Sequence, residues 1–148
     1  MMDGALELAS ALARRFEGLY LKPYLCPAGV PTIGYGSTRY EDGRRVSFAD
    51  PAITRERAEE LLMWELRTVC VPQVLKLCPG LNTHERTAAI LDFAFNCGVG
   101  NLRASTLRKK INAGEWGDVP AELMKWTRGG GRVLKGLQLR RAAEAALI

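Results

Sequence analysis

The sequence predicts an α+β fold in which a small antiparallel sheet adjoins a larger helical part. Two observations carry this prediction. Apolar residues recur every three to four positions in residues 3–17 and again from residue 54 onward, which is typical of amphipathic helices. Residues 19–48 instead hold three prolines and four glycines between short β-prone segments, a pattern that favours strands joined by tight turns.

A chain of 148 residues is most simply one domain, and at this length it can bury roughly two-thirds of its unfolded surface. We therefore expect a single domain over residues 1–148. Its sheet lobe should cover about residues 18–50, and its helical lobe about residues 54–148 together with the first helix. The content of 47% hydrophobic and 25% charged residues is ordinary for a soluble protein.

The first helix is predicted over residues 3–17, where Asp3 can cap the start and Gly18 can stop the end. The sheet is expected from two segments, VPTIGYGST and RRVSF. The turn YEDGRR fits a hairpin, in which Asp42-Gly43 supplies the positive φ angles of the turn.

Five further helical stretches are predicted beyond residue 53. Thr54 can cap the first of them, whose apolar face runs to Val69 before Pro72 kinks or ends the helix. Asn82 and Glu85 have the spacing of a capping box that opens the second. The remaining boundaries are a stop at Cys97-Gly98, a short helix from Ser105 to Ile111, helices over 118–127 and 136–147, and a flexible loop over 128–132.

The formal net charge is +5 and the isoelectric point about 9.2, which favours anionic polymers such as nucleic acid, anionic lipid or anionic cell wall. Charge alone does not choose among these. The four cysteines form no Cys-x-x-Cys pair and His84 is the single histidine, which argues against a zinc site. We expect no metal, no cofactor and no structural disulfide, with Cys70, Cys78 and Cys97 behaving as small buried hydrophobes.

Glu17, Cys26 and Thr32 form the most informative pattern of the chain. Glu17 stands at the end of a predicted helix, and a hairpin-like segment then carries Cys26 and Thr32 toward the same place. Their spacing, Glu-x8-Cys-x5-Thr, resembles the Glu-x8-Asp/Cys-x5-Thr constellation of the phage-type lysozymes, the endolysins of glycoside hydrolase family 24. The resemblance implies the two-lobed lysozyme-like fold, with the glycan bound in a cleft between the sheet and the helical lobe. It also implies hydrolysis of the β-1,4 bond between N-acetylmuramic acid and N-acetylglucosamine in bacterial peptidoglycan.

Two later blocks extend the resemblance over nearly the whole chain. Residues 93–113 are similar to the family's central segment, where Phe-Asn-x-Gly-x-Gly precedes Ser-Thr-Leu, and residues 126–147 are similar to its C-terminal signature. Asn96 would bind an N-acetyl group or orient Glu17, unless it only caps its helix. The residues that the resemblance would place along or near the cleft are Tyr24, Gly34, Tyr35, Phe95, Asn96, Ser105 and Thr106.

The chemistry of Glu17 follows from what a glycosidic bond requires. The leaving oxygen must receive a proton, so the acid must still be protonated near neutral pH, which requires a pKa raised by burial or by unfavourable charge. The C-terminal end of a helix carries partial negative charge and disfavours a second negative charge there. Arg14 and Arg15 would oppose this effect if they lay close to Glu17. Taken alone, Glu17 would be read as an ordinary surface glutamate; the joint spacing makes it the expected general acid.

Cys26 replaces the aspartate that many members of the family carry at this position. No carboxylate lies between Glu17 and Glu41, so the sequence favours an attacking water over a glycosyl-carboxylate intermediate. Either Cys26 or Thr32 could hold that water. A free thiol has a pKa near ~8.5, which an ionised glutamate nearby would raise further, so Cys26 is expected to act as a weak acceptor or steric guide. Taken singly, Cys26 could be a small buried hydrophobe and Thr32 a β-branched strand residue.

Three other functions remain as alternatives. A lytic transglycosylase also uses a glutamate but closes the sugar on itself without water, whereas Thr32 and Cys26 suggest a held water. A cysteine peptidase built on Cys26 and His84 would place its thiol at a helix N-terminus, which a Pro/Gly-rich hairpin does not provide. A non-enzymatic domain that binds an anionic polymer such as nucleic acid would use the positive net charge and residues 128–132. No run of aromatic residues that could stack on bases accompanies this segment.

The expected partners follow from the resemblance and from the N-terminus. Asp3 and Glu7 stand where a signal peptide would carry basic residues, and no apolar run approaches the ~20 residues that span a bilayer. We therefore expect a monomer in the host cytoplasm, without stable membrane insertion and without nucleic acid, that acts on peptidoglycan. Release to the wall by a separate holin-type permeabilising protein is implied by the resemblance. Arg140 and Arg141 are expected to form ion pairs that tie the last helix to the first, or else a solvated basic face.

Overall fold

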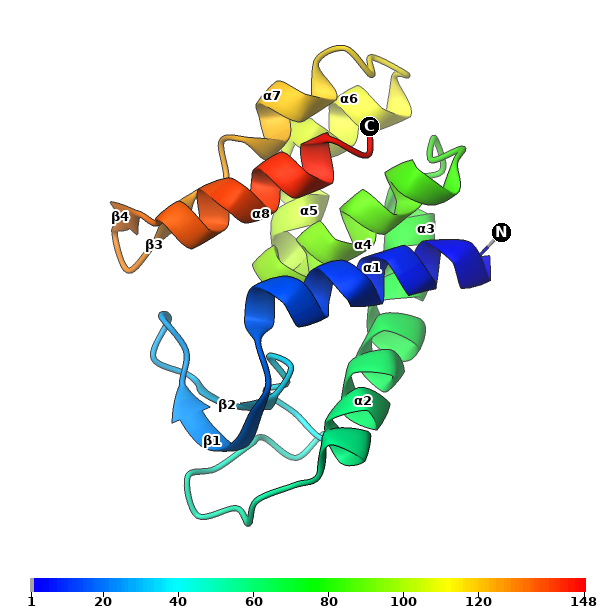
Figure 1. Cartoon of the computed structure of the whole chain (residues 1–148). Coiled ribbons are helices and arrows are strands. Elements are labelled where there is room, and N and C mark those ends of the chain that lie inside the picture. The colour runs from blue at the N-terminus through cyan, green and yellow to red at the C-terminus, as the bar shows by residue number, and fades with distance from the viewer. Residues whose placement is uncertain (1) are drawn as a thin grey trace.

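The computed structural model describes residues 2–148 and confirms the α+β prediction. A two-stranded hairpin lies to one side of the helices, and a long helical connection rises from it into the helical lobe (Figure 1). The elements in chain order are α1 (Met2–Glu17), β1 (Tyr20–Leu25), β2 (Pro31–Gly34), α2 (Arg55–Trp64), η1 (Glu65–Cys70), α3 (Val71–Leu77), α4 (His84–Cys97), α5 (Val99–Ala104), α6 (Thr106–Asn112), α7 (Val119–Leu123), β3 (Arg128–Gly129), β4 (Arg132–Val133) and α8 (Lys135–Ala145).

Helix α1 ends where the sequence predicts and begins slightly earlier. Gly18 has a φ of 72° and its N–H donates to the Arg14 carbonyl at 3.1 Å, so the glycine stops the helix directly after Glu17. Asp3 lies in the first turn of the helix, so the prediction that it caps the helix is wrong. Its carboxylate there still opposes the positive end of the helix dipole.

The pair of strands that forms the sheet is not the pair that the sequence predicted. β1 and β2 pair antiparallel, with Tyr24 opposite Thr32 and an irregularity between Tyr20 and Tyr24. The predicted strand RRVSF is wrong, since that region makes one isolated bridge, between Arg39 and Arg45. Asp50 explains why no strand forms: it accepts from the Tyr40 hydroxyl at 2.7 Å and from the Ser47 N–H at 2.9 Å, so side-chain hydrogen bonds hold these residues in turns.

The connection between the lobes is an α-helix that passes into a π-turn. Thr54 caps α2 as predicted, its side chain accepting from the Arg57 N–H. Pro72 neither kinks nor ends the connection: it lies in the first turn of α3, where its missing N–H is tolerated. The Val71 N–H donates to the Leu66 carbonyl, five residues back, and this wider turn shifts the apolar face. Val69 is therefore exposed, which corrects its predicted place on that face.

Three boundaries in the helical lobe also differ. The side chain of Thr83 caps α4 by accepting from the Arg86 N–H at 3.1 Å, whereas Asn82 accepts from the Arg86 guanidinium, so the capping box predicted for Asn82 is wrong. The helix predicted over 118–127 covers only Val119–Leu123. The loop predicted over 128–132 is the β3–β4 hairpin, with Gly130 and Gly131 at positive φ. The stop at Gly98 and the Ser105 cap of α6 are confirmed.

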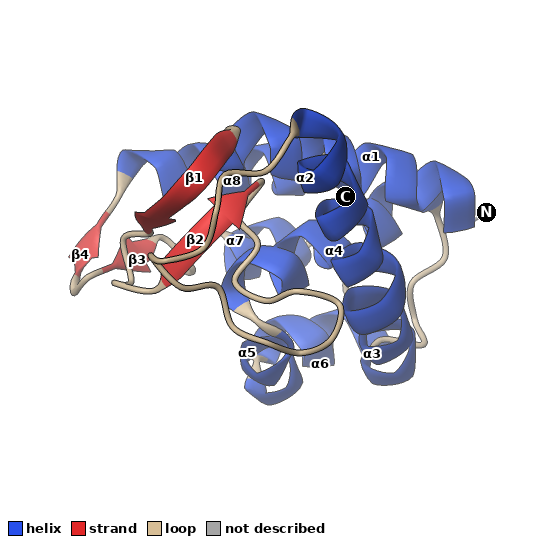
Figure 2. Ribbon diagram, turned by 90° about the horizontal axis from the view of Figure 1, so that it is seen from below, coloured by secondary structure: helices blue, strands red, loops and turns tan. Residues whose placement is uncertain are grey.

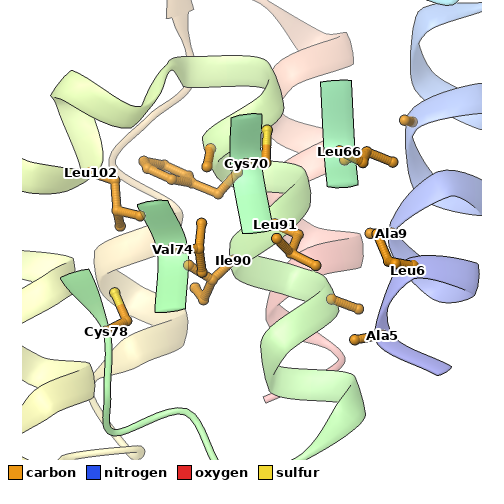
Figure 3. Packing of buried hydrophobic residues seen from close by; sticks show 14 of the residues in the cluster. Ala5, Leu6, Ala9, Leu66, Cys70, Val74, Cys78, Ile90, Leu91 and Leu102 are labelled. Atoms are coloured by element: carbon orange, nitrogen blue, oxygen red, sulfur yellow. The ribbon is translucent and has the colours of Figure 1, made fainter. Parts of the chain in front are cut away.

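The hydrophobic core surrounds α4, which is buried from Thr87 to Ala94. Figure 3 shows Ala5, Leu6 and Ala9 of α1 facing α4, whose Leu91 points toward them. The small alanines let α1 lie close to α4, and α8 packs against both helices. This packing fixes the end of α1, and with it Glu17, against the helical lobe.

All four cysteines are free thiols; Cys70 and Cys78 are buried as predicted, whereas Cys97 is only half-buried. Within residues 2–148, none of the helices has both the length and the apolar character that crossing a bilayer would need.

Candidate active site

Glu17 is the last residue of α1, and 18% of its side chain is exposed. The turn after β2 lies directly against its carboxyl group. Gly36 in this turn has a φ of 79°, and a Cβ added to it would lie 2.6 Å from the carboxyl carbon of Glu17. Only glycine fits both the backbone angle and the space, so the sheet lobe contacts Glu17 through bare backbone.

Arg140 of α8 binds Glu17 from the other side. Its Nη1 donates to the Glu17 carboxylate at 2.6 Å, while its Nε and Nη2 donate to the two oxygens of Asp92 at 2.9 and 2.8 Å. Both Arg140 and Asp92 are almost wholly buried. The prediction that Arg140 ties the last helix to the first is therefore confirmed. Burial alone would raise the pKa of Asp92, but the hydrogen bonds from Arg140 outweigh it and hold that pKa below its usual value.

Arg141 makes a second buried cluster, and it does not reach α1 as predicted. Its Nε lies 2.8 Å from Glu144 on the same helix, and its Nη2 donates to Asn96 at 2.7 Å. Its Nη1 contacts the Cys97 sulfur. Cys97 therefore makes a polar interaction, whereas the sequence predicted only a small buried hydrophobe. Burial and the neighbouring Asp92 raise the pKa of Glu144. The paired groups at this end of α8 thus comprise two guanidinium groups and three carboxyls, and one carboxyl can hold a proton while the total charge stays balanced.

The sheet hairpin carries the other predicted catalytic residues. Thr32 is almost wholly buried, and its hydroxyl donates to the Val30 carbonyl at 2.8 Å. Cys26 opens the turn between the strands, where the Gly29 N–H donates to its carbonyl at 2.8 Å. Tyr24 lies within electrostatic reach of both Glu17 and Cys26: burial raises its pKa to about 12, and the charges of Glu17, Tyr20 and Cys26 add to the effect. The hairpin therefore places Thr32 opposite Tyr24, whose hydroxyl is affected by the charges of Glu17 and Cys26.

The remaining predicted substrate-binding residues lie mostly in structural contacts. Gly34 packs against Ala58 of α2, where a Cβ would lie 3.2 Å from the alanine methyl group. Tyr35 belongs to the buried core, and the half-buried Phe95 packs against it. The Ser105 hydroxyl caps α6 and donates to the Leu102 carbonyl, while Thr106 is exposed.

Asn96 is not a helix cap, since the C-cap residue is Gly98. Its carbonyl oxygen accepts from Arg141, which fixes the orientation of the side chain and leaves its amide N–H groups without a hydrogen bond among residues 2–148.

Sequence reasoning missed two acidic residues near Glu17. Asp92 stands in the apolar run of α4, and an acid at a buried position was the available signal for a partner cation. Glu65 lines a cavity of about 430 Å³ together with Thr38, Arg39 and Trp64. Nothing in the local pattern of α2 distinguishes Glu65 from the solvent-facing glutamates before it.

The chain is similar to known proteins over nearly its whole length. The family model described as phage lysozyme matches residues 14–144. The endolysin of Acyrthosiphon pisum secondary endosymbiont phage 1 is 37% identical over 145 residues, which cover 95% of this chain and 94% of the relative. The endolysin of Bacillus phage B103 is also 37% identical, but the chain spans about half of its length, 50%.

Two solved structures share the whole fold. The endolysin from Escherichia coli O157:H7 phage FAHEc1 superposes with a TM-score of 0.82 at 30% identity, covering 95% of this chain and 89% of that one. The muramidase domain of SpmX from Asticaccaulis excentricus gives a TM-score of 0.77 at 29% identity, covering 94% and 93%. The matched sequence includes the Glu17 helix end, the hairpin and the α8 arginines, and the chain belongs to the phage lysozyme family.

Proposed function

We propose that this chain cleaves the β-1,4 bond between N-acetylmuramic acid and N-acetylglucosamine with Glu17 as the general acid and a water molecule as the nucleophile. As a member of the phage lysozyme family the chain is a peptidoglycan hydrolase, a lysozyme. The proposal adds the bond, the residues and their roles. The observation that carries it is the setting of Glu17, at the junction of the two lobes between Gly36 and Arg140.

The surroundings of Glu17 support its role as an acid. Its carboxyl is mostly withdrawn from water, and the helix that it ends points its partial negative charge at it. Arg14, which would favour the ionised carboxylate, is held elsewhere by Glu59 at 2.7 Å. Arg140 does favour the ionised form, but its charge is shared with Asp92 through two hydrogen bonds.

Thr32 supports the water-based mechanism through the direction of its hydroxyl. Because the hydrogen of this hydroxyl is engaged by the Val30 carbonyl, the lone pairs of Oγ1 are free to accept from a water molecule. A water that donates to Thr32 keeps its own lone pair for the anomeric carbon. Cys26, beside Tyr24 at the mouth of the hairpin turn, would limit where that water can lie.

The hairpin offers no carboxylate nucleophile. Glu41, the first acidic residue after Glu17, is bound by both terminal nitrogens of Arg57 at 2.5 and 2.6 Å. A retaining reaction through a glycosyl-carboxylate would need a second carboxyl about 5 Å from the acid. We therefore infer an inverting reaction, in which the water held by Thr32 and Cys26 attacks the face opposite Glu17.

The test is to digest purified peptidoglycan and determine the new sugar ends by mass spectrometry. A muramidase leaves reducing muramic ends, a lytic transglycosylase leaves 1,6-anhydro ends, and a peptidase releases amines. Glu17→Gln should lower the rate by at least about 10²-fold, because a positioned general acid contributes that much or more. Glu7→Gln, an exposed glutamate on the same helix, is the matched control and should keep wild-type activity. Anhydro ends, or an active Glu17→Gln protein, would reject the proposal.

The route to the wall is a further part of the proposal. We infer that the chain acts as a monomer, is made in the host cytoplasm and reaches peptidoglycan through a membrane opened by a separate permeabilising protein. Expression of the chain alone should then leave cells intact, while addition of a membrane-permeabilising agent should cause prompt lysis. Lysis without any permeabilising agent would contradict this route.

A further inference from the structure

Two arginines of the sheet lobe lie opposite each other on neighbouring stretches of backbone. Arg39 and Arg45 form an isolated antiparallel bridge, and both side chains are exposed. A backbone hydrogen bond of 2.9 Å flanks the pair on each side, from the N–H of Tyr40 to Arg44 and from the N–H of Val46 to Thr38. Because these bonds join the neighbours and not the two arginines, the pair is of the closer antiparallel kind, with Cα atoms about 4.5 Å apart. The two side chains therefore leave the same face of the backbone next to each other.

This arrangement is unfavourable for the folded protein on its own. Like charges that lie directly opposite each other on an antiparallel pair repel and destabilise it. Within residues 2–148 neither arginine of the bridge makes an ion pair, whereas the neighbouring Arg44 binds Asp50 at 3.1 Å. The other carboxylates of this region are engaged elsewhere, since Glu41 is bound by Arg57 and Asp42 accepts from the Arg44 N–H. The two guanidinium groups are therefore left without an anion.

The surrounding turn fixes the backbone that carries the pair. The Gly43 N–H donates to the Tyr40 carbonyl at 2.9 Å, and the φ of 87° at Gly43 closes the turn. Tyr40 and Val46, which follow the two arginines in the chain, are buried in a small core with Ile33 and Leu61. The backbone therefore cannot easily separate the two charges, and a bound anion would relieve their repulsion.

The pair also lies close to the candidate active site. Gly36, which touches the Glu17 carboxyl, precedes Arg39 by three residues, so their Cα atoms are at most about 11 Å apart. Arg39 lines the cavity of about 430 Å³, whose wall includes Trp64. Glu65 lines the same cavity but makes no ion pair with Arg39 among residues 2–148. A group attached to the sugar beside the cleaved bond could therefore reach the arginine pair.

We propose that Arg39 and Arg45 together bind a carboxylate of the peptide stem that peptidoglycan carries, and thereby favour glycan strands with stems. A carboxylate has two oxygens that accept hydrogen bonds from guanidinium groups, so one carboxylate can engage both arginines. The stem is attached to the muramic acid, the sugar whose bond is cleaved, so its free carboxylates are carried close to the site. The inference rests on the proposed function only in taking Glu17 as the place of cleavage.

Binding can be measured without catalysis. Isothermal titration calorimetry compares a peptidoglycan disaccharide that carries a tetrapeptide stem with the same disaccharide without a stem. The wild-type protein should bind the stem-bearing disaccharide more tightly. Arg39→Gln and Arg45→Gln should each reduce this preference by up to about fivefold, the scale of one exposed charge pair. Arg103→Gln is the matched control, since it removes an exposed guanidinium from α5, and it should keep the preference. Equal binding of both disaccharides by the wild-type protein would overturn the inference.

The repulsion between the arginines gives a second measurement, with the opposite sign. Arg45→Glu replaces the like-charged pair by an oppositely charged one, so its melting temperature should rise slightly above that of the wild type while the preference for stems is lost. Arg45→Lys keeps the positive charge and should keep most of the preference. Differential scanning calorimetry and the binding titration measure the two effects. An Arg45→Glu protein that melts below the wild type, or that keeps the preference, would contradict the proposal.

The catalytic consequence is a change in KM that depends on the stem. In the double variant Arg39→Gln, Arg45→Gln, the KM for stem-bearing glycan strands should rise while kcat stays unchanged. Strands from which an amidase has removed the stems should be cleaved as by the wild type. Equal losses on both kinds of strand would indicate a structural role and reject the inference.

A phosphodiester of the wall is the other source of an anion for this pair. A soluble polymer of glycerol phosphate therefore serves as a competitor in the binding titration. If it displaces the stem-bearing disaccharide from the wild type but not from Arg103→Gln, or if it binds through Arg39 more tightly than the stem does, the assignment to the stem is wrong. Full activity of Glu17→Gln would instead reject the proposed function, while the calorimetric preference for stems would still stand.

Discussion

Gly36 shows how one residue sets the geometry of the candidate acid. Its missing side chain lets backbone of the sheet lobe touch the Glu17 carboxyl, and its φ of 79° lies in the region that other residues avoid. A substitution there changes two things, the strain of the turn and the space around Glu17. The chain offers a glycine that separates them: Gly43 has a φ of 87° and nothing within 4 Å of an added Cβ.

We expect Gly36→Ala to lower activity by about 10²-fold, because the methyl group displaces the carboxyl from its position. Its free energy of unfolding should fall by about 1–3 kcal/mol from backbone strain. Gly43→Ala should show the loss of stability alone. Urea denaturation and lysis of cell-wall suspensions measure the two effects. Equal losses of activity in both variants would show that the contact with Glu17 does not matter.

Cys26 allows a test of how the attacking water is held. Cys26→Asp places at this position the carboxylate found in many members of the family, so we expect the variant to keep much of its lytic activity. Cys26→Ala removes the acceptor but keeps a small side chain, and it should be slower than both. The measurement is initial rate of lysis at matched protein concentration, with circular dichroism as the check on folding. A folded but inactive Cys26→Asp protein would mean that the thiol itself is needed.

At the scale of elements, the connection from α2 through η1 to α3 shapes the site more than its sequence suggests. Its π-turn displaces the apolar face, exposes Val69 and places Glu65 beside the turn that touches Glu17. A straight α-helix through these residues would give a different face to the sheet lobe. Because burial disfavours the ionised carboxylate of Glu65, this residue lowers the stability of the fold by an amount that depends on pH.

That cost has a definite sign. The pKa of Glu65 lies near about 7 in the folded protein, above the usual 4.5, so the folded state binds more protons than the unfolded state between these values. Stability contributed by this group is present below that window and is lost as the pH rises through about 7. Glu65→Gln should therefore melt a few degrees higher than wild type at pH 8 and much like it near pH 4. Differential scanning calorimetry at both pH values checks this, and a lower melting temperature at pH 8 would contradict it.

For the whole molecule, local signals in the sequence predicted what depends on local structure. Thr54, Ser105 and Gly98 mark their helix ends because caps and stops are decided within a few residues. The partners of Glu17 could not be derived in this way. Arg140 lies 123 positions away and Asp92 lies in an apolar run, so only the tertiary packing of α1, α4 and α8 brings them together.

The same reasoning explains the errors along the chain. The strand predicted at RRVSF has suitable residues, but Asp50 captures the Tyr40 hydroxyl and the Ser47 N–H and holds the region in turns. The loop predicted over 128–132 is a hairpin whose tip lies near the first one, since a Cβ at Gly130 would lie 3.9 Å from the Pro27 carbonyl oxygen (Figure 2). Composition alone did not indicate that contact.

The net charge of +5 makes a prediction for the molecule as a whole. A basic enzyme is attracted to an anionic wall, and salt screens that attraction over roughly 10 Å at about 0.1 M. Raising sodium chloride from about 0.05 M to about 0.5 M should lower the rate of wall lysis several-fold. Cleavage of a short soluble peptidoglycan fragment, which contains the same bond but carries few charges, should change less under the same conditions. An equal effect on both substrates would show that salt acts on the enzyme itself and not on its attraction to the wall.

The link between Glu17 and Arg140 has a consequence for how the enzyme comes into being. A ribosome adds Arg140 to the growing chain 123 positions after Glu17. Until α8 has left the exit tunnel and docked, the nascent chain carries the candidate acid Glu17 without Arg140, which binds both Glu17 and Asp92 in the folded protein. A chain that is released before α8 is complete therefore lacks the contact that ties Glu17 to the helical lobe.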